Sequence, residues 1–82
     1  MMLKLFCVFD SKVGSYLPPF SARTAGEAIR MFESSVKQEK SQMALFATDY
    51  SLFEVGSFDD QLATFEFPKA PAVIATASQF VE

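Results

Sequence analysis

Few side chains in this sequence could carry out chemistry, and the carboxylates are the first to consider. Asp59 and Asp60, with Glu54 nearby, could hold a divalent cation through their carboxylate oxygens. Aspartates in a tight turn also accept hydrogen bonds from the backbone, and that role explains both residues without a metal. We therefore expect no metal site here.

Cys7 is the single cysteine, so it cannot close a disulfide within the chain. A thiol acts as a nucleophile when a neighbouring base activates it, and the sequence contains no histidine. Cys7 also lies in an apolar, strand-like segment, where a buried and reduced thiol is the ordinary state. We expect no catalytic residue and no cofactor, and hence a protein that is not an enzyme.

Basic side chains could form a phosphate-binding strip along a predicted helix and its exit. The candidates for nucleic-acid binding are Arg23, Arg30, Lys37 and Lys40. Because Glu27 and Glu33 are interspersed, an ordinary solvated helix face is the competing interpretation. The formal net charge of -3 disfavours purely electrostatic binding to nucleic acid, although a local basic patch remains open.

Aromatic side chains are the other candidates for binding. Ten of the 82 residues are phenylalanine and 50% are hydrophobic, which is more apolar surface than so small a domain readily buries. The rings could stack on unpaired bases, or they could form the core and the interface of a homodimer, which the acidic balance favours. The predicted association surface consists of Phe6, Val8, Phe53, Phe65 and Phe67.

These residues are positioned by two predicted hairpins. In residues 50–67, two aromatic and aliphatic runs flank Asp59, Asp60 and Gln61, short polar residues that are typical of a tight turn. A strand at residues 2–9, a turn at 10–14 and a short strand at 15–17 form the first hairpin, which two prolines then end.

The strand at residues 2–9 is apolar on both faces. Leu3, Leu5, Cys7 and Phe9 alternate with Met2, Lys4, Phe6 and Val8. A single helix covers one face of a sheet, so we expect the other face to contact a second copy or a ligand. Phe6 and Val8 are the residues that we expect to make this contact.

Thr24 and Glu27 match a capping box, which predicts a helix at residues 25–38. Its apolar stripe consists of Ala25, Ala28, Ile29, Phe32 and Val36. The expected fold is α+β: a four-stranded antiparallel sheet in the order β-β-α-β-β with one helix on one face. We assign residues 1–69 to a single domain and residues 70–82 to a tail that is docked or partly flexible. No repeat, signal peptide or membrane span is visible.

Several stretches resemble the small nonstructural protein of gokushovirus-type microviruses, which are bacteriophages with single-stranded DNA genomes. The stretches are residues 5–10 with Lys12 and Gly14, residues 16–20, 25–32, 49–53 and 55–59. The resemblance implies an early, non-capsid protein that is described as DNA-binding or as acting in the switch to single-stranded genome synthesis. It implies no catalytic residues. Family members often have a glycine in the turn corresponding to residues 59–62, and this chain has none there.

The sequence thus favours a homodimeric, non-enzymatic phage protein of the host cytoplasm. It would assist single-stranded DNA genome synthesis by binding DNA or phage and host replication proteins. The alternative is a protein-interaction module that binds a host or phage protein without contacting nucleic acid. We expect no membrane contact.

Overall fold

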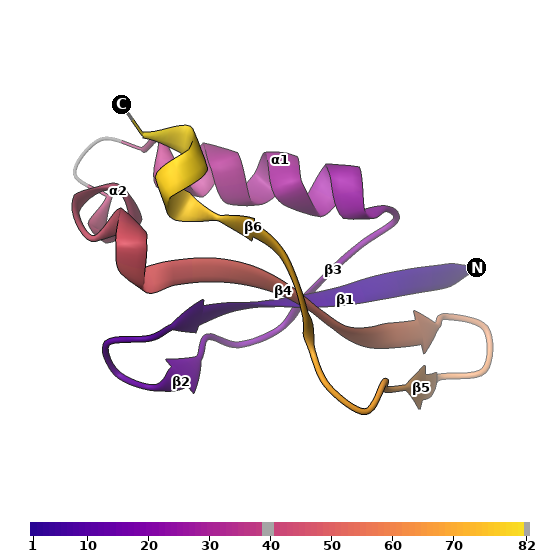
Figure 1. Cartoon of the computed structure of the whole chain (residues 1–82). Helices are drawn as coiled ribbons and strands as arrows, with labels where there is room; N and C mark the ends of the chain where they lie inside the picture. Colours follow the sequence, from indigo (N-terminus) through magenta and orange to yellow (C-terminus); the bar gives the residue numbers. More distant parts are fainter. Residues whose placement is uncertain (39–40, 82) are drawn as a thin grey trace.

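The computed structural model describes residues 1–38 and 41–81, and it has two layers (Figure 1). One layer is an antiparallel sheet of six strands: β1 (Met2–Asp10), β2 (Ser15–Tyr16), β3 (Phe20–Ala22), β4 (Tyr50–Asp59), β5 (Thr64–Glu66) and β6 (Ala72–Thr76). The other layer covers one face of this sheet. It holds the main helix α1 (Ala25–Val36), the short helix α2 (Gln42–Leu45) and the 3-10 turns η1 (Ala47–Asp49) and η2 (Ala77–Phe80).

The two long strands β1 and β4 form the centre of the sheet. They pair antiparallel from Met2–Asp59 to Asp10–Tyr50, with a β-bulge after Leu5. On its side away from β4, strand β1 pairs with β2 and β3. On its side away from β1, strand β4 pairs with β5 and β6. The fold class and both hairpins agree with the sequence, whereas the predicted count of four strands is wrong.

The two strands that the sequence did not predict are short and follow prolines. β3 comes directly after Pro18 and Pro19, and β6 comes directly after Pro71. Proline interrupts a ladder, but here the chain resumes pairing with the same long strand further along. Most of the segment assigned to a tail, residues 70–82, is therefore part of the sheet and of η2; residue 82 lies outside the described residues.

Helix α1 begins where its cap predicts. Thr24 has extended backbone angles, and its hydroxyl oxygen accepts a hydrogen bond from the Glu27 amide at 3.1 Å. The Glu27 carboxylate accepts from the Arg23 amide at 3.4 Å, one residue earlier than a full capping box requires. The helix ends at Val36, two residues before the predicted end.

The core lies between α1 and one face of the sheet. Ala28, Phe32 and Val36 of the predicted stripe are buried, and Ala25 and Ile29 pack against them. They meet side chains of the long strands, chiefly Phe6, Val8, Tyr50 and Leu52. Phe6, Leu52 and Val36 are the largest fully buried side chains, and each contributes about 1.5–3 kcal/mol of hydrophobic stabilisation.

The chain consists of two versions of one unit, a repeat that inspection of the sequence missed. Each version is a long strand, a four-residue turn, a short strand, a proline-containing break, another short strand and a helical segment, which is α1 in the first version and η2 in the second. The matching stretches are Val13-Gly14-Ser15-Tyr16 with Leu62-Ala63-Thr64-Phe65, and Thr24-Ala25-Gly26-Glu27 with Thr76-Ala77-Ser78-Gln79. Because β1 and β4 are antiparallel neighbours, an approximate two-fold axis perpendicular to the sheet relates the two versions.

The two turns have the same hydrogen bonds. The Asp10 carboxylate accepts from the amides of the residues two and three positions later, and the Asp59 carboxylate does the same. Each turn ends with a left-handed residue, Gly14 with φ of 80° and Ala63 with φ of 57°. Glycine adopts this conformation without steric cost, whereas alanine does not. The turn that lacks glycine therefore carries strain at Ala63.

Exchanging the residues at these two equivalent positions should change stability in opposite directions. We expect Ala63→Gly to raise the free energy of unfolding by about 1 kcal/mol and Gly14→Ala to lower it by at least that amount. Urea denaturation followed by circular dichroism measures both. A destabilised Ala63→Gly variant would contradict the strain assigned to this turn.

Candidate functional site

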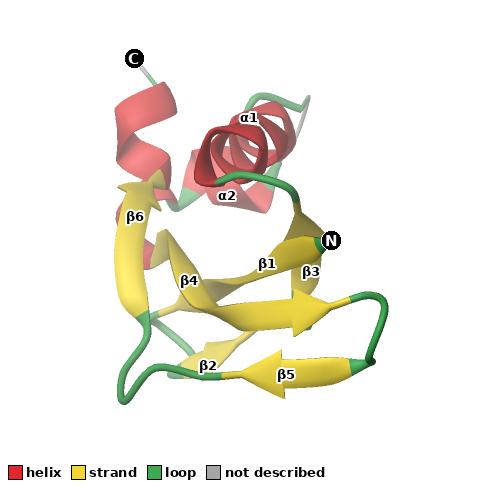
Figure 2. Ribbon diagram, turned by 90° about the vertical axis from the view of Figure 1, so that its right-hand side faces the viewer, coloured by secondary structure: helices red, strands yellow, loops and turns green. Residues whose placement is uncertain are grey.

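The face of the sheet opposite α1 has no helix over it in the part of the chain that the structure describes. Figure 2 shows the helical layer on one side of β1 and β4, and β2 and β5 on the other. Side chains alternate between the two faces of a strand, so this face carries the neighbours of the core residues. We call it the aromatic face, and its residues are Leu3, Leu5, Cys7, Phe9, Tyr16, Phe53, Phe58, Phe65 and Phe67.

One aromatic cluster lies where β2 pairs with the end of β1. Phe9 and Tyr16 are cross-strand partners with ring centroids 4.7 Å apart and an interplanar angle of 48°. Phe53 meets both rings edge-on, at 6.0 Å from Phe9 and 5.6 Å from Tyr16. Such edge-to-face contacts are favourable for aromatic pairs, so the cluster supports itself without a covering helix.

A second cluster lies where β5 pairs with the end of β4. Phe58 and Phe65 are cross-strand partners with centroids 4.8 Å apart and an interplanar angle of 39°. The Phe67 ring is nearly parallel to that of Phe65, at 6.0 Å and 5°. Phe67 also lies over Gly56, where an added Cβ would come within 2.7 Å of the ring. Only glycine leaves room for the ring at this point.

Both clusters are built on projecting hairpin arms. We call residues 11–19 the β2 arm and residues 60–70 the β5 arm, and every residue in both is exposed. Tyr16 is 45% exposed, Phe65 55% and Phe67 68%. Exposed rings gathered on one face are typical of interaction surfaces.

An apolar hollow of about 380 Å³ crosses the aromatic face. Its lining residues are Leu3, Leu5, Pro19, Phe20, Ser21, Phe58 and Phe65. Its lining comes from β1, β3, β4 and β5 and the adjoining Pro19. Leu3 and Leu5 at the centre of the sheet therefore share one hollow with Phe58 and Phe65 of the second cluster. A ligand on this face would contact flat rings and aliphatic side chains.

The family model described as Phage ORF5 protein matches residues 3–80, which is nearly the whole chain. The chain belongs to this Phage ORF5 protein family. Neither a curated protein nor a solved structure matches it. The family match agrees with a phage origin.

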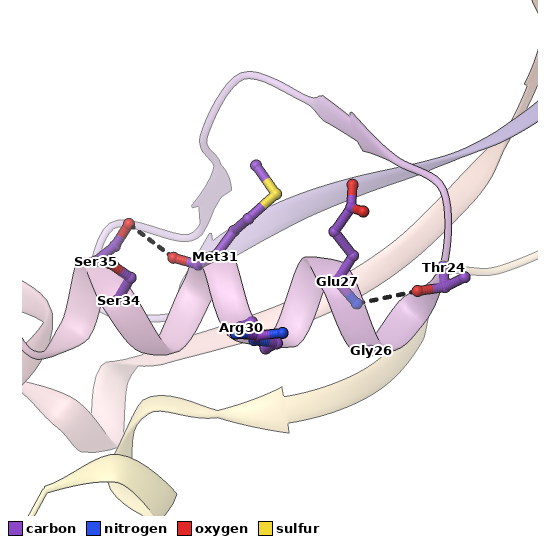
Figure 3. A pocket seen from close by; sticks show the side chains of 7 residues that line it. All are labelled: Thr24, Gly26, Glu27, Arg30, Met31, Ser34 and Ser35. Carbon is purple, nitrogen blue, oxygen red and sulfur yellow. Dashed lines mark hydrogen bonds between the residues drawn. The ribbon is translucent and has the colours of Figure 1, made fainter.

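In this ORF5 family member the described residues of the predicted basic strip lie on α1 and at its two ends, across the sheet from the aromatic face. Arg23 contacts the carboxylate of Glu27 at 3.8 Å, and Lys37 contacts that of Glu33 at 2.7 Å. Arg30 lines a hollow on the outer face of the helix with Glu27 and two serines (Figure 3). Lys40 lies outside the described residues. Two of the three described cations are thus partly neutralised by a neighbouring carboxylate, and phosphate binding by this strip stays a prediction.

The predicted association surface is divided between the two faces of the sheet. Phe53, Phe65 and Phe67 lie on the aromatic face. Phe6 and Val8 are instead 0% and 7% exposed in the core beneath α1, so the prediction that they contact another chain is wrong. The sequence identified a two-sided strand correctly, but the helix covers the side that was assigned to a partner.

The other candidates from the sequence have structural roles. Asp59 accepts two turn amides, and Asp60 contacts the Met1 amino group at 2.7 Å. Cys7 is 8% exposed, and burial raises the pKa of its thiol, which disfavours the reactive thiolate. Within residues 1–38 and 41–81, no helix is long and apolar enough to cross a membrane.

The structure adds Phe9 and Tyr16 to the aromatic face, and sequence reasoning proposed neither for binding. A signal for them is present in the repeat: Phe9-Asp10 and Phe58-Asp59 each precede a turn that is followed by a hydroxyl residue and an aromatic residue. Aligning the two stretches matches Tyr16 with Phe65, so Tyr16 would have joined Phe65 among the residues predicted for binding.

The two faces can be distinguished by placing a charge on each. We expect Phe6→Asp to unfold the protein, because a buried and unpaired carboxylate together with the lost core contacts costs at least about 3 kcal/mol. Phe65→Asp, at a side chain that is 55% exposed, should remain folded. Circular dichroism with urea titration measures the difference. A folded Phe6→Asp variant with unchanged stability would contradict the assignment of the core.

Proposed function

We propose that this protein is a non-enzymatic phage protein that acts in the host cell by binding single-stranded DNA during genome synthesis. The observation that carries the proposal is the aromatic face, with exposed rings on a sheet whose other face is occupied by helices. Bases of a single strand are not paired, so their flat faces are free to stack on such rings. A sheet with helices behind it and aromatic side chains in front is one arrangement that binds single strands.

The charge distribution supports a mode of binding dominated by stacking. The protein carries a formal net charge of -3, which opposes long-range attraction to phosphates. Each arm carries one lysine, Lys12 in the β2 arm and Lys69 in the β5 arm. At most about two phosphate contacts therefore come from the arms, while rings and aliphatic side chains supply the rest of the interface. Binding of this kind is tolerant of sequence, because every base has a flat face.

Fluorescence anisotropy with labelled (dT)16 tests this function. We expect binding at 50 mM salt that weakens by only about sevenfold at 200 mM, the loss expected for two phosphate contacts with a single strand. A duplex of the same length should bind more weakly, because its bases are already stacked and paired. The double variant Tyr16→Ala/Phe65→Ala should bind (dT)16 at least about tenfold more weakly than the unaltered protein.

Phe46→Ala is the matched control. Phe46 is also an exposed phenylalanine, at 51%, but it lies at the end of α2 and lines a hollow with Asp49 and Tyr50. Its removal should leave the affinity unchanged. Absence of any binding at 50 mM salt would contradict the proposed function. Equal losses of affinity in the control and the double variant would show that binding does not depend on the aromatic face.

A second copy of the chain is the other candidate occupant of this face. The observation that favours it is the composition of the face itself, whose defining residues include no charged side chain. Uncharged aromatic surface is typical of the centre of a protein–protein interface. The homodimer would then be formed by two aromatic faces in contact.

Sedimentation equilibrium distinguishes this second candidate. If the aromatic faces pair, the unaltered protein should be a dimer at micromolar concentrations and Phe65→Asp should be a monomer, because the dimer would bury an unpaired charge. Phe46→Asp serves as the control at an exposed ring outside the face and should leave the dimer intact. A monomer for the unaltered protein at these concentrations would exclude this dimer.

A further inference from the structure

We infer that the aromatic face holds two equivalent base-stacking stations, so that one DNA strand binds both at once. The first station is the ring pair Phe9 and Tyr16, and the second station is the ring pair Phe58 and Phe65. The inference rests on the proposed binding of single-stranded DNA and specifies how many bases are held and how far apart they lie.

The ring geometry of the stations is almost the same. The centroids are 4.7 Å apart at the first station and 4.8 Å at the second, and the interplanar angles are 48° and 39°. In each station one ring comes from the end of a long strand and the other from the short strand that pairs with it. Both pairs are cross-strand partners beside equivalent turns, so their geometry follows from the repeat.

The frameworks that hold the stations also agree. The two rings of each station flank a turn in which an aspartate accepts two amides and a left-handed residue precedes the short strand. At the tips, Val13 and Leu62 occupy equivalent positions with exposures of 73% and 71%. Each station thus has one ring on an arm with the same turn and one ring on a long strand, on the same face of the sheet.

The register of the sheet gives the spacing of the stations. Phe58 pairs with Leu3, six residues before Phe9 on β1, which corresponds to roughly 20 Å at about 3.3 Å per residue. The whole molecule is 41 Å long, so the stations lie apart along its length. Each strand of a DNA duplex advances about 3.4 Å per nucleotide, and an unstacked single strand is more extended, so at most about six nucleotides separate the bases bound at the two stations.

A repeating ligand is the occupant that matches this arrangement. Two equivalent stations on one face suit a chain that presents the same chemical group at intervals, and single-stranded DNA presents flat bases on a continuous backbone. Once one base is bound, the backbone holds later bases near the other station at high effective concentration. Affinity should therefore depend on whether the strand is long enough to reach both.

A ladder of oligothymidylates tests the two stations. (dT)2, (dT)4, (dT)8 and (dT)16 compete with labelled (dT)16 for the full-length protein. The affinity of the unaltered protein should rise more than tenfold from (dT)2, which cannot span roughly 20 Å, to (dT)8, and less than threefold from (dT)8 to (dT)16. A gradual rise with length and no step would overturn the two-station arrangement while leaving single-strand binding in place.

Tyr16→Ala and Phe65→Ala each remove one ring from one station. Each should weaken (dT)16 binding by between about 5-fold and 150-fold, the range for losing one stacked base, and the two losses should agree within about threefold. Each variant should also lose the step between (dT)2 and (dT)8. Circular dichroism confirms that the variants are folded, and Phe46→Ala is the control that should keep the step.

The remaining outcomes are also decisive. A loss for only one of the two variants would show a single station and overturn the inference but not the proposed function. Absence of (dT)16 binding by the unaltered protein would overturn both. If sedimentation shows a dimer that both variants dissociate, and no DNA binds, a second copy occupies the stations and the inference fails.

Discussion

The antiparallel pairing of β1 with β4 is the interaction on which the rest of the structure depends. β2 and β3 pair only with β1 in the described residues, and β5 and β6 pair only with β4. The core beneath α1 is formed mainly by side chains of these two strands, chiefly Phe6 and Leu52. The two clusters of the aromatic face lie at opposite ends of the ladder formed by these strands, one at Phe9 of β1 and the other at Phe58 of β4. One ladder therefore supports both the stability and the proposed binding surface.

The size of the chain explains why the aromatic face is open. A chain of 82 residues provides one helix of three turns, which with its short neighbours covers one side of a twisted sheet. The covered side buries the largest core side chains, and the open side keeps three exposed rings, Tyr16, Phe65 and Phe67, beside the partly buried Phe9, Phe53 and Phe58. Exposing such rings to water is unfavourable, and a bound molecule removes that cost. The division into a stabilising face and an open aromatic face follows from having a single helical layer.

Sequence reasoning predicted the elements with strong local signals. The Thr24 cap and its apolar stripe located α1, and the aspartate turns located both hairpins. It was wrong or incomplete where the local sequence carries no pattern for the feature in question. Periodicity of two shows that Phe6 and Phe9 lie on opposite faces, but no local rule says which face a distant helix will cover. Strand β3 has three residues and strand β6 lacks alternation, so neither produces a recognisable pattern.

The candidate site was predicted only in part for the same reason. Phe53, Phe65 and Phe67 were recognised as surface aromatics, whereas Phe9 and Tyr16 become part of the same face only through the pairing of β1 with β2 and β4. The cations on α1 were recognised as a strip, but pairing with Glu27 and Glu33 could be seen only on the helix. The internal repeat is the one sequence signal that relates the two hairpins to each other, and it is weak because few of its positions are identical.

The exposure of the two arms has a consequence for how they move. Every residue of the β2 and β5 arms is exposed, and each arm is held to the sheet by a few backbone pairs of a two- or three-residue strand. Segments of this kind open locally at a much smaller free-energy cost than the long central strands, so their amides exchange with solvent first. In the proposed function, Tyr16 and Phe65 on these arms would adjust to purines and pyrimidines of different size, while β1 and β4 remain fixed. Ordering the arms on binding would cost conformational entropy, which would limit the affinity for any single base.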